Sequence, residues 1–246
     1  MTANSRTWTK WNNLLKIVWL SLWLGIATLL VTVPILLLSL FGASSRVIFM
    51  FVRLWARIIL TISGVTLVVK GSENLEKNSS YIIIANHQSH FDGPALASSL
   101  DLQFRWIAKK ELLKIPIFGH ALKAAGNIFI DRRDHETAMR TINEGISQLP
   151  KGAGVMFFAE GTRSEDGVIG QFKKGGFTAA IQTGLPILPV TIKGSSQALP
   201  KGGIVFHAGV IEVTVGESID PSKYSLEQLD ELVEKTRDII VSNYQQ

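Results

Sequence analysis

The feature that most constrains this chain is a run without any charged residue, residues 17–41. As a helix with a rise of 1.5 Å per residue, this run would be roughly 37 Å long, which exceeds the ~30 Å hydrocarbon core of a bilayer. Arg6, Lys10 and Lys16 precede it, and no acid does. The run is too long for the apolar region of a cleaved signal peptide, which spans about 7–15 residues. It therefore predicts an immersed N-terminal helix.

The next segment, residues 46–62, is apolar except for a few hydroxyls and for Arg46, Arg53 and Arg57. On a helix these arginines fall within roughly 40° of one another. Placing arginine at a bilayer centre costs about 2.5–3.5 kcal/mol per residue, so two full spans are disfavoured. An in-plane helix would turn the arginines to lipid phosphates. The alternative is a helix that packs on the rest of the chain, and both can hold. We expect residues 1–62 to form a two-helix membrane-binding segment.

From residue 63 onward the pattern alternates between strands and helices. Such alternation predicts an α/β catalytic domain, residues 63–246, with a mixed, largely parallel sheet flanked by helices. Pro186 and Pro189 indicate an edge strand or a strand start. Strands are expected at 65–69, 81–85, 104–108, 127–131, 155–158, 187–192 and 211–215; helices are expected at 93–100, 109–125 with a break at Pro116, 134–149 and 173–183, with a last helix after a Ser225–Gln228 capping box.

Composition narrows the classes of function. The 246-residue chain has no cysteine, which excludes a thiolate nucleophile, disulfides and Cys-ligated metal. A net charge of +5 and a pI of about 9.5 favour an anionic partner. Hydrophobic residues make up 46% of the chain and are concentrated at the N-terminus, so the partner is expected to be membrane rather than nucleic acid.

The polar stretch that follows the strand at 81–85 carries the first candidate site. His87 and Asp92 lie where an α/β sheet binds its ligands, at the end of a strand. Their spacing puts them about 140° apart on an ideal helix, so they can pair only if the intervening turn curls back. Asp92 would then hold one imidazole nitrogen and leave the other as a free base. Alternatively, Asp92 caps a helix and His87 is a structural turn residue.

Two further strand ends carry arginine, whose fork-shaped guanidinium suits phosphate. Arg132 and Arg133 follow the strand at 127–131, although a solvated charge pair is the simpler interpretation of these two alone. The strand at 155–158 leads into Glu160, Gly161, Thr162 and Arg163, and Lys173 to Gly176 form a basic, glycine-rich helix entry. Glu160 could accept a substrate hydroxyl, and Arg163 could take phosphate.

Together these blocks resemble the 1-acyl-glycerol-3-phosphate acyltransferase family. Asn86-His87 with Asp92 is similar to its H-x4-D block, and residues 126–132 resemble its second block. Residues 158–164 match its F-x-E-G-T-R-S pattern, and residues 185–190 resemble its proline-containing fourth block. The resemblance covers residues 81–190, and all four blocks occur in order.

The resemblance implies an enzyme that moves a fatty acyl group from a coenzyme A or acyl-carrier-protein thioester to the sn-2 hydroxyl of lysophosphatidic acid. It implies no cofactor, no metal and no acyl-enzyme intermediate. We expect it at the bacterial inner membrane, with the catalytic domain on the cytoplasmic side. The implied catalytic residues are His87 as base and Asp92 as its partner; the implied substrate-binding residues are Lys109, Arg132, Glu160, Gly161, Thr162 and Arg163.

Three other readings compete with this one. A serine hydrolase could use Ser89, but no G-x-S-x-G motif is present. A metal site could use His87 and His90, but His120, His135 and His207 are scattered. A membrane-tethered protein that only binds lipid phosphate is predicted to have the arginines but not the histidine–aspartate pair, so the presence of both His87 and Asp92 counts against it.

Overall fold

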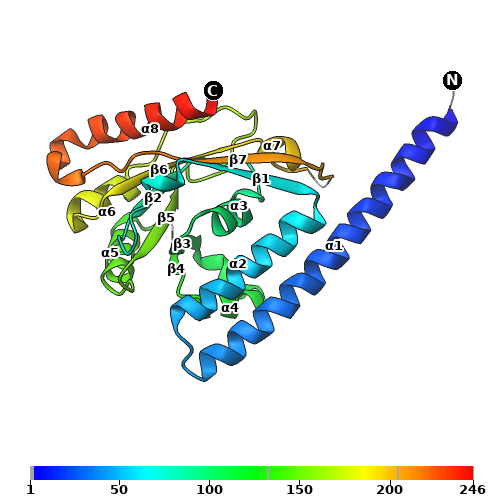
Figure 1. Cartoon of the computed structure of the whole chain (residues 1–246), viewed down its shortest axis with the longest axis horizontal. Helices are drawn as coiled ribbons and strands as arrows, with labels where there is room; N and C mark the ends of the chain where they lie inside the picture. The colour runs from blue at the N-terminus through cyan, green and yellow to red at the C-terminus, as the bar shows by residue number, and fades with distance from the viewer. Residues whose placement is uncertain (1–2, 132, 204, 246) are drawn as a thin grey trace.

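The computed structural model describes residues 3–131, 133–203 and 205–245; in the first helix it describes the side chains of residues 15, 17–19 and 21 onward. Its centre is a seven-stranded sheet in the order β1-β7-β6-β2-β5-β3-β4 (Figure 1). All neighbouring strands are parallel except β6 and β7, so the predicted mixed, largely parallel sheet is confirmed. The strands are β1 (Val65–Lys70), β2 (Ile82–Ala85), β3 (Gln103–Lys109), β4 (Ile128–Ile130), β5 (Ala153–Phe158), β6 (Ile187–Lys193) and β7 (Gly209–Val215).

Helices cover both faces of this sheet. The predicted break at Pro116 is present, since it separates the 3-10 turn η2 from α4. The Ser225–Gln228 capping box is also present and leads through a 3-10 turn into the last helix. The helices are α1 (Ala3–Leu40), α2 (Ser45–Ile62), α3 (Asp92–Ser99), α4 (Phe118–Ala124), α5 (His135–Ser147), α6 (Gly175–Thr183), α7 (Ser195–Ala198) and α8 (Leu229–Gln245); the 3-10 turns are η1 (Ser72–Asn74), η2 (Lys110–Lys114), η3 (Pro221–Lys223) and η4 (Leu226–Gln228).

The buried strand β2 organises two cores. Because side chains alternate along a strand, Ile83 and Ala85 join one cluster with α2 and α3, while Ile82 and Ile84 join another with α5, α6 and α8. All four residues are fully buried. Strands buried on both faces have continuous apolar sequences, which is why residues 82–85 contain no polar side chain.

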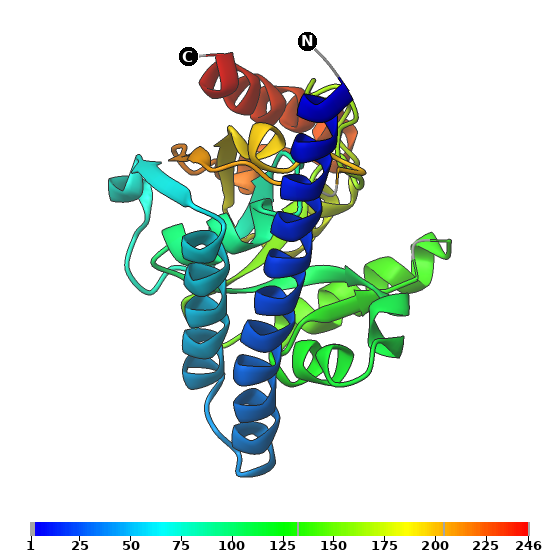
Figure 2. The same cartoon turned by 90° about the vertical axis from the view of Figure 1, so that its right-hand side faces the viewer.

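The two N-terminal helices form a hairpin beside the domain. Helix α2 packs against α3, and α1 runs antiparallel to α2 and extends beyond the domain at its N-terminal end (Figures 1 and 2). Within the described residues one segment, Ile17–Leu40, is long and apolar enough to cross a membrane. Leu40 and Phe41, at the hairpin turn, are 80% and 86% exposed. The structure therefore contains the two expected helices, of which one is a candidate span.

The arginines of α2 do not share one environment. The Arg53 guanidinium donates to the carbonyl oxygen of Leu100 at 2.6 Å and that of Ala97 at 3.3 Å, at the C-terminus of α3. It also lies 3.5 Å from the Asp101 carboxylate. Arg46 and Arg57 are exposed. Arg53 therefore packs α2 onto the domain, and a shared stripe of all three arginines facing lipid phosphates is wrong.

The proline-containing strand meets one of the two expected alternatives. Strand β6 lies between β7 and β2, so it is not an edge strand, but Pro186 does immediately precede the strand start. Between the bridge Ile187–Ile219 and the pair Val190–Val215 the register shifts by one residue. The extra residue belongs to residues 216–218, and Pro189 lies opposite this bulge, where a missing ladder donor is tolerated.

Candidate active site

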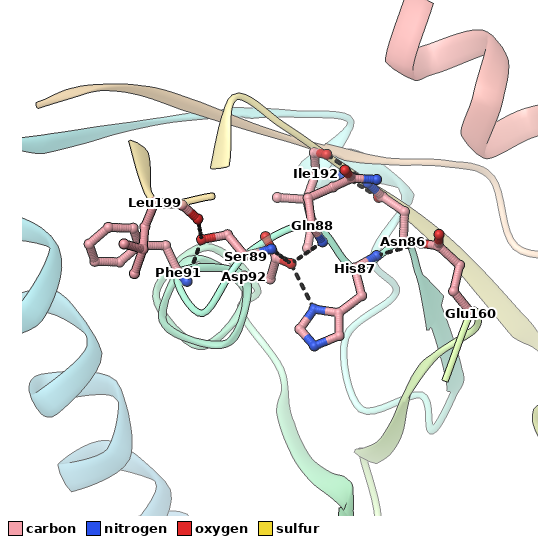
Figure 3. A network of polar contacts seen from close by, with 9 residues as sticks. All are labelled: Asn86, His87, Gln88, Ser89, Phe91, Asp92, Glu160, Ile192 and Leu199. Atoms are coloured by element: carbon pink, nitrogen blue, oxygen red, sulfur yellow. Dashed lines mark hydrogen bonds and ion pairs between the residues drawn. The ribbon is translucent and has the colours of Figure 1, made fainter. Parts of the chain in front are cut away.

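His87 and Asp92 meet at the carboxyl end of β2 (Figure 3). The Nδ1 atom of His87 lies 2.8 Å from Oδ2 of Asp92, so the turn between them does curl back. The Asp92 side chain is fully buried, whereas that of His87 is 20% exposed. The imidazole stacks on Phe158, with ring centroids 3.8 Å apart. A bond at Nδ1 leaves Nε2 as the nitrogen that can act on a substrate.

Backbone hydrogen bonds fix the Asp92 carboxylate. Its Oδ2 atom accepts from the amide nitrogens of Gln88 at 2.6 Å and Ser89 at 2.8 Å. Asp92 is the first residue of α3, yet its side chain turns back to the preceding loop instead of bonding to the helix. The alternative in which Asp92 caps a helix is therefore wrong. Three contacts on one oxygen fix the position of the carboxylate beside the imidazole.

Side chains of the same loop tie it to the neighbouring elements. Asn86 is fully buried and exchanges two hydrogen bonds of 2.8 Å with the main chain of Ile192 on β6. Ser89 donates from Oγ to the carbonyl oxygen of Leu199 and accepts from the amide of Phe91. Ser89 is buried, and its hydroxyl is used in the hydrogen bonds to Leu199 and Phe91. This geometry argues against a serine nucleophile.

Glu160 connects the loop after β5 to His87. Its Oε1 accepts from the His87 amide at 2.9 Å, and its Oε2 accepts from the Gly170 amide at 2.9 Å. The amide of Ser164 in turn donates to the His87 carbonyl oxygen at 2.9 Å. Both peptide groups of His87 are thus held by the Glu160–Ser164 turn. The spacing of the F-x-E-G-T-R-S block therefore has a structural reason.

A cavity of about 650 Å³ opens beside His87. One wall is apolar, and Gly176 allows α6 to approach it closely, since a Cβ at Gly176 would lie 2.8 Å from Ile84 Cδ1. Exposed polar residues mark the opening to solvent. The apolar wall consists of Ile84, Ile107, Ile130, Met139, Ile142 and Phe157, and the polar lining includes His87, His135, Thr162, Arg163, Lys173 and Lys174.

The electrostatics of the opening are positive. Partial burial and the nearby charges of Arg163 and His87 lower the pKa of His90. His90 is exposed on the same turn as His87, and Arg163 is half-buried and lines the cavity. The Arg163 guanidinium in the cavity lining favours an anionic substrate group at this opening.

Some of the remaining predicted residues line the cavity, and others do not. Gly161 has a φ of +72°, which the turn after β5 requires, and its amide donates to the Phe158 carbonyl oxygen. Thr162 is exposed and lines the cavity. Lys109 does not line it, and its ammonium lies 3.4 Å from Glu111. Arg132 is outside the described residues.

Comparisons with known proteins agree with this geometry. A family model described as "Acyltransferase" matches residues 66–193, which include all the strand ends of the site. The chain belongs to the acyltransferase family. A 1-acyl-sn-glycerol-3-phosphate acyltransferase of Borreliella burgdorferi is 34% identical over 197 residues, 80% of this chain and 78% of the relative.

Two further matches extend the comparison. The chloroplastic 1-acyl-sn-glycerol-3-phosphate acyltransferase LPAT1 of Arabidopsis thaliana is 38% identical over 158 residues, 63% of this chain. The chain spans only 44% of that relative. The crystal structure of the 1-acyl-sn-glycerophosphate acyltransferase PlsC from Thermotoga maritima matches with a TM-score of 0.82 and 29% identity over 94% of each chain. This acyltransferase therefore shares its fold with PlsC.

Several positioning residues of the acyltransferase site were not predicted. The sequence suggested a substrate contact for Glu160, but both its oxygens accept backbone amides. The buried amide of Asn86 and the ring of Phe158 were not assigned any role. Their signal was present, since a polar Asn directly after a buried strand must find partners.

Proposed function

We propose that this acyltransferase transfers a fatty acyl group from an acyl thioester to the sn-2 hydroxyl of 1-acyl-glycerol-3-phosphate, forming phosphatidic acid. The observation that carries the proposal is the 2.8 Å contact between His87 Nδ1 and buried Asp92 beside a cavity with an apolar wall and Arg163. The names of the relatives from Borreliella burgdorferi and Arabidopsis thaliana support the acceptor.

In this mechanism His87 acts as a general base. Asp92 keeps the proton on Nδ1, so the Nε2 lone pair accepts the proton of the acceptor hydroxyl as that oxygen attacks the thioester carbonyl carbon. A carbon–oxygen bond forms and the carbon–sulfur bond breaks. The imidazolium returns the proton to the departing thiolate. Because the acceptor oxygen attacks the thioester directly, no acyl-enzyme forms. General-base help of this kind contributes about 10²–10⁴-fold to the rate.

The two ends of the cavity suit the two ends of the substrates. Arg163 would hold the acceptor phosphate together with Arg132, which lies outside the described residues, and Thr162 lines the cavity next to Arg163. The apolar wall would take an acyl chain, since its residues are those a hydrocarbon contacts favourably. Glu160 would position His87 and leave the acceptor hydroxyl to the imidazole.

The donor and the location belong to the same proposal. The donor is a coenzyme A or acyl-carrier-protein thioester, and the reaction needs no cofactor. The apolar segment Ile17–Leu40 and the exposed hairpin turn at Leu40 and Phe41 would anchor the protein in one leaflet of the bacterial inner membrane. The catalytic domain would face the cytoplasm, where the thioester is made.

The test is acceptor-dependent release of thiol. The purified full chain is given an acyl thioester, and free thiol is followed with a thiol reagent, which the cysteine-free chain does not consume. We expect thiol only when lysophosphatidic acid is added, with phosphatidic acid formed in equal amount. Thiol release without acceptor would mean a thioesterase, and no release with any donor and acceptor pair would mean a lipid-binding protein.

A further inference from the structure

A second pocket, of about 450 Å³, lies at the opposite end of the strands from His87. It is formed by the amino-terminal parts of β3 and β4, the C-terminal half of α5 and the first residue of α2. None of its lining residues lines the cavity beside His87. Its polar lining residues are Ser45, Arg105, Asn127, Thr141, Glu144 and Gln148.

Arg105 is the unusual residue of this pocket. It is only 5% exposed, and its one side-chain hydrogen bond within the described part of the chain runs from Nη1 to the carbonyl oxygen of Phe104 at 3.4 Å, a long contact. Among the residues that the structure describes, no carboxylate forms an ion pair with it. Gly126 packs on the guanidinium, and a Cβ there would lie 2.6 Å from Arg105 Nε.

A guanidinium in this position needs a counter-charge. Arginine stays charged in proteins, and a buried charge without a partner destabilises the fold. Burial lowers the pKa of Arg105. A guanidinium has five N–H donors in a planar fork, and Arg105 lines the pocket, so the donors not used on Phe104 are available to a ligand there.

We propose that this pocket binds a phosphate oxyanion through Arg105. The guanidinium fork matches two phosphate oxygens, and the amide of Gln148 adds a donor from the end of α5. The pocket volume lies in the range of small-molecule sites, so a phosphate carried on a small organic group fits.

Two sources can supply such a phosphate. One is a free phosphate or small phosphate ester. The other is a phospholipid headgroup, because Ser45 joins the pocket to the hairpin turn whose Leu40 and Phe41 are exposed. A purely structural rival also exists: the exposed Glu144 lines the same pocket and could turn inward to pair with Arg105.

Thermal unfolding of the full chain in an uncharged detergent tests the proposal. The parent for this experiment is the Arg163→Ala variant, in which phosphate binding at the active site no longer contributes to the unfolding midpoint. Sodium phosphate, compared with sodium chloride at equal ionic strength, should raise the unfolding midpoint of Arg163→Ala. Adding Arg105→Met should weaken the apparent phosphate affinity at least about tenfold, as expected for a lost charge-assisted bond. Adding Arg140→Met, which removes an exposed arginine of α5, should leave it unchanged.

The same variants separate the outcomes. If vesicles containing phosphatidylglycerol raise the midpoint in an Arg105-dependent way and inorganic phosphate does not, the ligand is a lipid headgroup; the reverse identifies a free phosphate. Without any anion, Arg105→Met should unfold at the same or a higher temperature than the parent. The proposal is overturned if neither phosphate source stabilises the parent. It is equally overturned if Arg105→Met and Glu144→Gln each lower the midpoint in anion-free buffer, because the two residues would then form a structural pair.

Discussion

Replacing Glu160 with glutamine separates a positioning role from a substrate-binding role. The carboxylate accepts from the His87 and Gly170 amides, each at 2.9 Å, and the side chain is 8% exposed. Glutamine keeps one acceptor oxygen and turns an NH₂ group toward the other amide. Losing one hydrogen bond to a charged group costs about 1.5–3 kcal/mol. For a chain of this size, at 2–4 °C per kcal/mol, the unfolding midpoint should fall by about 3–12 °C.

The kinetic assay is thiol release at varied acceptor concentration. Because Glu160 holds the peptide group of His87, we expect kcat to fall while the KM for lysophosphatidic acid stays close to that of the parent. Glu165→Gln is the matched control: Glu165 is exposed and pairs with Lys201 at 2.9 Å, and surface pairs contribute only about 0–1 kcal/mol. A raised acceptor KM with an unchanged midpoint in Glu160→Gln would refute the positioning role.

Three further predictions follow from the same geometry. Arg163→Ala should raise the KM for lysophosphatidic acid by about 10–150-fold, with little change for the acyl donor; equal effects on both substrates would mean that Arg163 does not hold the acceptor phosphate. The pKa of His90 is lowered in the fold, so the folded chain binds fewer protons at this residue than the unfolded chain. The free energy of unfolding should therefore fall as the pH drops below about 6.5. In denaturant titrations, His90→Asn should flatten that pH dependence. A cysteine at Ser44, at the exposed hairpin turn, should not react with a membrane-impermeant reagent outside intact cells; labelling from outside would mean that α1 crosses the bilayer.

The sheet could be predicted because its strands are short apolar runs separated by polar turns. Residues 81–85 are read as buried directly from composition, and the structure buries each of them. The pairing of His87 with Asp92 could be stated only as a condition on the turn. The contacts that hold this turn in place come from distant parts of the chain, because Glu160, Ser164 and Ile192 all form hydrogen bonds with the loop.

The errors have the same physical origin. Helical periodicity grouped the three arginines of α2, but the carbonyl oxygens of α3 that bond to Arg53 lie more than 40 residues away in sequence. The rule that proline marks an edge failed at Pro189 because a bulge with β7 removes the need for its donor. Local patterns do not contain these long-range contacts.

The central claim is that His87, held by Asp92, is the base of an acyl transfer without an acyl-enzyme. The most direct measurement is acceptor-dependent thiol release by His87→Ala, with circular dichroism and the unfolding midpoint as checks that the fold is intact. We predict that the folded variant loses transfer by at least about 10²-fold, and that Asp92→Asn is nearly as severe because control of the tautomer is lost. Near-parental turnover by a folded His87→Ala protein would contradict the account.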